Sequence, residues 1–143
     1  MIVVMPVRWN QLTDTLWEKC EPYVQEGCDV CATEDASDVL TWVKERVVQL
    51  WLVMERNENS SLLIGVLITE IVNCPKANIM RYRLYGGRMN AEVVKAISEV
   101  VNPWAVAQGC DRAEVWGRPG WERVGRTFIS AVRRKAVILQ GDL

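Results

Sequence analysis

The sequence predicts an α+β domain, an α/β sandwich in which helices flank a central, mostly antiparallel mixed sheet. Apolar residues recur at helical spacing before residue 46 and again after residue 90, whereas the stretch between them is rich in strand-forming runs. The resulting order is β-α-α-β-β-β-α-β-α-β, which predicts a central meander and one β-α-β crossover towards the C-terminal end. The 143 residues suffice for a single domain over 1–143.

The N-terminal third is expected to contain one strand and two helices. The β-branched run at 2–7 predicts a strand that leads into a polar turn. Apolar residues at helical spacing predict a helix over about 12–27, with Thr13 and Asp14 as candidate caps. An acidic capping segment at 35–38 then begins a second helix that extends to residue 46.

The middle of the chain changes to strand periodicity. The runs at 47–56 and 62–72 are separated by a polar turn and predict an antiparallel hairpin. A further strand is expected over 77–85, where Gly86-Gly87 should end it.

The C-terminal third is expected to return to helix and strand. Asn90 is a suitable cap for a long helix to Gln108, and Pro103 should kink or split that helix. A short strand at 112–116, a turn at 117–120, a short helix over 119–128 and a last strand at 136–139 complete the order.

Composition excludes several classes of function. Seventeen Lys and Arg against eighteen Asp and Glu give a net charge of −1, so electrostatics provide no basis for binding nucleic acid or an anionic membrane. Apolar stretches such as 62–68 are far shorter than the ~20 residues of a membrane span. Residues 1–7 carry neither a basic region nor a small-residue cleavage site, so no signal peptide is expected.

Histidine, cysteine and tryptophan narrow the chemistry further. The chain has no histidine, which removes the commonest general base and metal ligand. Of five cysteines, Cys28 and Cys31 form a C-x-x-C motif that lacks a second ligand pair, so structural or incidental reduced thiols are expected and no metal. A redox or metal role for that motif stays open. Seven tryptophans are more than one small core would hide, which favours aromatic contacts at an interface or groove.

Several segments resemble the GNAT (GCN5-related N-acetyltransferase) superfamily. The runs at 49–53 and 63–66 resemble its paired central strands. Leu84-Tyr85-Gly86-Gly87, the helix end at 103–111 and the segment at 117–124 resemble small GNAT-like proteins of tailed bacteriophages, some of them similar to internal virion proteins of podoviruses. The resemblance covers residues 47–140, and the preceding part of the chain matches by element order only.

The resemblance implies where an acetyl-CoA site would lie. Active members hold the pyrophosphate on backbone N–H groups of a loop written R/Q-x-x-G-x-G/A at the start of a helix. Here Arg83 and Gly86 match the pattern, whereas Arg88 stands where Gly or Ala is expected. Arg83, Gly86, Gly87 and Arg88 are thus the candidate cofactor contacts, and a plain strand-to-helix turn is the alternative interpretation.

The resemblance also implies a catalytic base on a central strand and a tyrosine acid after the fifth strand. Glu70 is the candidate base, with a solvent-facing strand residue as the alternative. No tyrosine follows Tyr85, so the usual acid is missing. Arg118 and Trp121, in the turn after the fifth strand, are candidate interaction residues, or else Trp121 packs a helix onto the sheet.

Together these features predict a GNAT-fold bacteriophage protein with a degenerate acyl-CoA site and no cofactor. It is expected to act as a virion or virion-assembly component, present in the host cytoplasm during infection and in the virion. Its expected partners are other virion proteins and further copies of itself. The alternative is an active acetyl-CoA-dependent N-acetyltransferase that modifies an amine or a host protein. A small regulatory binder of a host enzyme is a third hypothesis.

Overall fold

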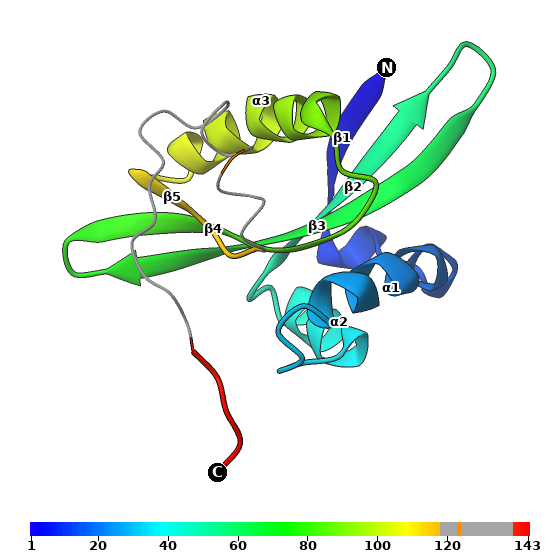
Figure 1. Cartoon of the computed structure of the whole chain (residues 1–143). Helices are drawn as coiled ribbons and strands as arrows, with labels where there is room; N and C mark the ends of the chain where they lie inside the picture. The colour runs from blue at the N-terminus through cyan, green and yellow to red at the C-terminus, as the bar shows by residue number, and fades with distance from the viewer. Residues whose placement is uncertain (118–122, 124–138) are drawn as a thin grey trace.

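The computed structural model describes residues 1–117, 123 and 139–143. It contains a five-stranded sheet with helices on both faces (Figure 1). The strands lie in the order β1-β2-β3-β4-β5; the first four are antiparallel and β5 is parallel to β4. The bounds are β1 Ile2–Val7, β2 Gln49–Arg56, β3 Ser61–Cys74, β4 Ala77–Gly87 and β5 Arg112–Val115; the helices are η1 Trp9–Gln11, α1 Asp14–Cys28, α2 Ala36–Lys44 and α3 Ala91–Ala107.

The sheet separates two apolar layers. Helices α1 and α2 cover one face with a cluster that includes Val24, Val39 and Leu50. Helix α3 covers the other face with a cluster that includes Val93 and Trp51. Alternate residues of a strand point to opposite faces, so β2 supplies Leu50 to one layer and Trp51 to the other.

The expected meander, the flanking helices and the β4-α3-β5 crossover are confirmed, and the expected helix caps act as such. Thr13 Oγ1 accepts a hydrogen bond from the Leu16 N–H group, and Asn90 Oδ1 accepts one from Val93 N–H. Of the described helices, none is both long and apolar enough to cross a membrane. Apart from residue 123, the last expected helix lies outside the described residues, as does nearly all of the last expected strand.

One expectation about chain breaks is wrong, and one alternative of a second is excluded. β4 does not end before Gly86-Gly87: Gly86 pairs with Val66 and Gly87 with Gly65, so the ladder with β3 holds both glycines in the strand. Pro103 does not split the third long helix, because α3 is continuous from Ala91 to Ala107, whereas the expected kink stays a prediction. A proline within a helix removes one backbone hydrogen bond and crowds the carbonyl four residues before it, and packing of the apolar face against the sheet offsets that cost.

Candidate functional site

The candidate site lies where β4 and β5 stop pairing. The parallel register runs from Ile79↔Arg112 to Tyr82↔Val115, and the Trp116 N–H group then donates to the Tyr82 carbonyl over 3.0 Å. β4 continues beyond this point to Gly87. The sheet thus places β4 residues 83–87 beyond its last pair with β5, which is the region where the sequence predicts the cofactor contacts.

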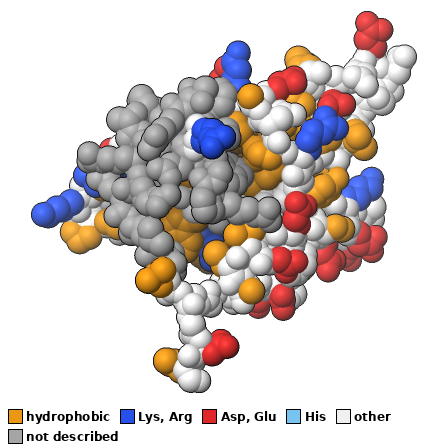
Figure 2. Space-filling view, in the orientation of Figure 1, with side chains coloured by type: hydrophobic (Ala, Val, Ile, Leu, Met, Phe, Trp, Pro, Cys, Tyr) orange, Lys and Arg blue, Asp and Glu red, His pale blue; other side chains and the backbone are white. Residues whose placement is uncertain are grey.

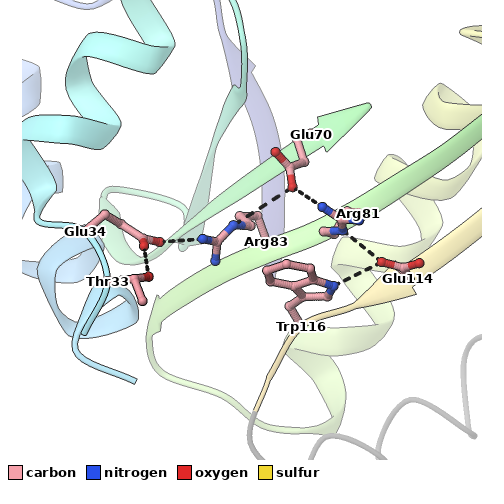
Figure 3. A network of polar contacts seen from close by, with 7 residues as sticks. All are labelled: Thr33, Glu34, Glu70, Arg81, Arg83, Glu114 and Trp116. Atoms are coloured by element: carbon pink, nitrogen blue, oxygen red, sulfur yellow. Dashed lines mark hydrogen bonds and ion pairs between the residues drawn. The ribbon is translucent and has the colours of Figure 1, made fainter. Parts of the chain in front are cut away.

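Glu70, the candidate base, lies in a network of ion pairs beside this region. It sits on β3 opposite Arg81 of β4, and its Oε1 is 2.7 Å from Arg81 Nη1 and 3.9 Å from Arg83 Nε (Figure 3). Its side chain is 20% exposed, so it is only partly open to solvent. Glu70 is a half-buried carboxylate held between two guanidinium groups.

The two arginines extend the network to both sides. Arg81 Nε pairs with Glu114 of β5 at 2.8 Å, and Arg83 Nη2 pairs with Glu34 of the α1–α2 loop at 2.8 Å. Burial alone would lower the pKa of Arg81, but hydrogen bonds to Glu114 and Glu70 outweigh it and raise that pKa. The Arg83 guanidinium, an expected cofactor contact, is therefore paired with a carboxylate of its own chain.

Trp116 is the member of this network that sequence reasoning missed. Its ring lies 4.2 Å from the Arg81 guanidinium carbon and 4.8 Å from that of Arg83, and its Nε1–H donates to Glu114 Oε1 over 3.0 Å (Figure 3). The available signal was the alternation Arg-x-Arg and Glu-x-Trp, which places each pair on one face of its strand. Trp116 thereby covers both arginines at the point where the strands part.

Gly86 and Gly87 serve close backbone contacts within the protein. A Cβ atom on Gly86 would lie 1.7 Å from the Tyr23 carbonyl oxygen of α1. Gly87 has φ +121°, a region that favours glycine, and a Cβ there would lie 2.3 Å from the Ile64 carbonyl oxygen. The two glycines allow α1 and β3 to approach β4, which is a structural reason for glycine at both positions.

Donors at the turn before α3 are also engaged within the chain. Gly87 N–H donates to Glu26 Oε2 over 3.1 Å, and Arg88 N–H donates to the Ile64 carbonyl over 2.8 Å. The Arg88 guanidinium forms an ion pair with Glu55 of β2. Gly87 and Arg88, two of the expected cofactor contacts, thus each bind a carboxylate of the same chain.

The two tyrosines of β4 both donate their hydroxyl groups to acceptors within the chain. Tyr82 O–H donates to Asn102 Oδ1 over 2.5 Å, and Tyr85 O–H donates to the Arg88 carbonyl over 2.7 Å. Burial raises the pKa of both phenols. Arg118 and Trp121, the candidate interaction residues, lie outside the described residues.

Three of the five cysteines are buried, and Cys31 and Cys74 are exposed. Burial raises the pKa of Cys20 and of Cys28 to about 11, with the negative charge of Glu34 adding to the effect at Cys28. Cys28 ends α1, whereas Cys31 is exposed in the turn that follows. Within the described ranges, no group of three or more Cys, Asp or Glu side chains is placed to hold a metal ion.

Comparison with solved structures identifies the fold. A ribosomal-protein-alanine N-acetyltransferase from Brucella melitensis biovar Abortus 2308 is 12% identical, with a TM-score of 0.66 over 99% of this chain and 100% of that one. An aminoglycoside acetyltransferase from an uncultured soil metagenomic sample is 10% identical, with a TM-score of 0.68 over 99% and 96%. A GNAT family acetyltransferase from Staphylococcus aureus is 12% identical, with a TM-score of 0.60 over 98% of both chains.

No protein-family model matches the chain, and no curated sequence matches it. Sequence identities of 10–12% show a shared fold and do not show a shared activity. The mixed sheet, its flanking helices and these structural neighbours together show that the chain has the fold of the GNAT acetyltransferases.

Proposed function

We propose that this chain is a GNAT-fold bacteriophage protein whose acyl-CoA site is degenerate, and that it acts through protein contacts as a virion or virion-assembly component. The observation that carries the first part is the turn before α3. There the carboxylates of Glu26 and Glu55 take the Gly87 amide and the Arg88 guanidinium, the donors on which a pyrophosphate would depend.

Electrostatics around the turn support this proposal. A diphosphate would have to displace both carboxylates while remaining close to them, and like charges a few ångströms apart repel. Residues 13–45, which contain α1 and α2, hold nine acidic and two basic side chains. Figure 2 shows Asp and Glu gathered on the side of the molecule where these helices lie. An anionic coenzyme would approach the turn against this field.

The state of the candidate catalytic groups points the same way. A general base needs a carboxylate oxygen that can reach the substrate proton. Oε1 of Glu70 accepts a hydrogen bond from Arg81, and the Trp116 ring covers the two arginines that pair with it. Removing Glu70 from this network would leave two half-buried guanidinium groups short of a counter-charge, so a structural role for Glu70 is favoured.

The protein-contact part rests on exposed apolar side chains and on the phage-like segments. Trp9 is 46% exposed, with the Arg46 guanidinium 4.4 Å from the centre of its ring, and Val47, which follows Arg46 in the chain, is 54% exposed. Tryptophan and arginine are frequent anchors of protein interfaces. The resemblance of residues 103–111 and 117–124 to phage GNAT-like proteins supports the proposed role in the virion. The protein would then be present in the host cytoplasm during infection and in the virion.

Two measurements test the proposal. Calorimetric titration of the purified chain with acetyl-CoA should give no heat, and acetyl-CoA should not raise the melting temperature, because a ligand that binds the folded state stabilises it. Micromolar binding would overturn the degenerate site and favour an N-acetyltransferase with Glu70 as its base. Mass spectrometry of purified particles and assembly intermediates should detect the chain; its absence from both would overturn the virion role.

A further inference from the structure

β1 is an edge strand of unusual composition. It pairs with β2 on one side, and no other described strand pairs with it. Its sequence, Ile-Val-Val-Met-Pro-Val, contains no charged side chain. Natural sheets protect their edges with lysine, other charges or proline, because free backbone groups invite another strand to pair. Here proline is the one such device.

The hydrogen bonds to β2 determine which groups of β1 face outward. Met1 N donates to the Arg56 carbonyl over 3.0 Å, and Arg56 N–H donates to the Met1 carbonyl over 2.8 Å, so Met1 and Arg56 form a doubly bonded pair. In a regular antiparallel ladder such pairs recur at every second residue. Val3, Met5 and Val7 therefore bond to β2, in the register Val3↔Met54, Met5↔Leu52 and Val7↔Leu50.

Ile2, Val4 and Pro6 consequently turn their backbone groups to the open edge. That edge offers two N–H donors, from Ile2 and Val4, and three carbonyl acceptors, from Ile2, Val4 and Pro6. Pro6 stands at one of the positions where a missing N–H costs the β1–β2 ladder nothing. None of these outward groups has a hydrogen bond to another residue in the described part of the chain.

We propose that this edge pairs with β1 of a second copy, antiparallel about a two-fold axis at Val4. Val4 N–H then donates to Val4 of the other copy, and Ile2 N–H donates to its Pro6 carbonyl, each bond made twice by symmetry. Both donors of the edge are used, and the proline is needed only as an acceptor. The pairing opposes the entire strand and joins two five-stranded sheets into one.

Side-chain chemistry agrees with that register. The opposed pairs are Val4 with Val4, Ile2 with Pro6 and Val3 with Met5, so no charge faces another charge. Val4 belongs to the apolar cluster under α3, and Val7 packs against the cluster under α1 and α2. Pairing at β1 therefore continues both apolar layers across the symmetry axis. A second copy fits because an uncharged strand with this donor pattern is complementary to itself.

The test is the mass of the full chain in solution, measured by sedimentation or light scattering. We expect twice 16.3 kDa. Val3→Lys should give a monomer, because it introduces two lysines opposite Met5 side chains. The matched control Leu62→Lys, at a β3 position that is 59% exposed, should remain dimeric. Pro6→Ala should tighten the dimer by about tenfold or more, because it adds two hydrogen bonds across the axis.

Amide hydrogen exchange by NMR provides a second measurement. Val3 and Met5 amides should be protected in the wild type and in Val3→Lys alike, because they bond to β2, whereas the Val4 amide should be protected in the wild type alone. A monomeric wild-type chain would overturn the proposal. So would a Val3→Lys variant that stays dimeric, a Val4 amide that exchanges freely in the wild type, or a Pro6→Ala dimer no tighter than the wild type. None of these readouts depends on acetyl-CoA, so this proposal and the proposed function can fail separately.

Discussion

Replacing Gly86 with alanine should destabilise the fold strongly, and the size of the effect follows from the packing of α1 on β4. The added Cβ would lie 1.7 Å from the Tyr23 carbonyl oxygen, whereas real Cβ contacts essentially never fall below 3.0 Å. The neighbouring atoms at 2.6 and 3.0 Å are also backbone atoms of Tyr23, so no side chain can rotate away. The helix must therefore move off the sheet by about 1.3 Å, as the difference between those limits requires.

Such a displacement loosens the cluster that contains Val24, Leu50 and Ile68. Overpacking a close-packed core costs about 1–3 kcal/mol, and a contact with rigid backbone belongs at the upper end of that range. For a domain of this length, about 3 kcal/mol lowers the melting temperature by roughly 10 °C. Thermal unfolding followed by circular dichroism measures the shift. Gly141→Ala, where a Cβ would have no neighbour within 4 Å, serves as the control and should leave the melting temperature unchanged.

A Gly86→Ala variant that melts within a degree or two of the wild type would refute this reasoning, because α1 could not then rest on Gly86. The experiment also separates two roles of the glycine. If the position served mainly to admit a coenzyme, alanine would abolish ligand binding and leave stability nearly intact. The structure instead predicts lost stability, with no ligand needed to observe it.

Three further predictions concern an ion pair, a buried hydrogen bond and the buried thiols. Glu34→Gln should lower the free energy of unfolding by about 2 kcal/mol in denaturant titrations, because the half-buried charge of Arg83 loses its partner. The control Glu99→Gln, in an exposed ion pair with Lys95, should change it by under about 0.5 kcal/mol. Thr69→Val should cost about 1–3 kcal/mol, because it removes the acceptor for the buried Trp51 Nε1–H, and Thr69→Ser should restore most of it. Stability should also fall as pH rises from 9.0 towards 11. Over this range the buried thiols of Cys20 and Cys28 keep their protons in the folded state, whereas the same thiols lose theirs in the unfolded state, so deprotonation favours unfolding. Melting temperatures measured at a series of pH values test this.

Local patterns were enough to predict most of the fold. Strand and helix periodicities differ, and the caps at Thr13 and Asn90 mark helix starts that the structure confirms. The Gly86-Gly87 break was predicted wrongly because glycine propensity is a local property, whereas pairing with β3 and the approach of α1 are not. Tertiary contacts outweighed the preference of the residues for a turn.

The candidate site was predictable only as a set of positions. The sequence indicated Glu70 and Arg83, but their pairing depends on the register of β3 against β4 and on the placement of the α1–α2 loop. Trp116 was missed because the parallel register of β5 brings it over Arg81 and Arg83 from more than 30 residues away in sequence. Neither a strand register nor a loop placement can be read from the alternation of apolar residues.

The fold makes fewer demands on the sequence than a coenzyme site does. A sheet covered by apolar layers needs side chains of suitable size and patterning, so it persists in proteins only 10–13% identical. A coenzyme site needs backbone donors that are free and glycines that leave room for a ligand. In this chain Gly86 makes room for α1, and the donors of Gly87 and Arg88 bind carboxylates of the same chain. In the degenerate site that we propose, these groups act within the protein, where they stabilise the contact between α1, β2 and β4.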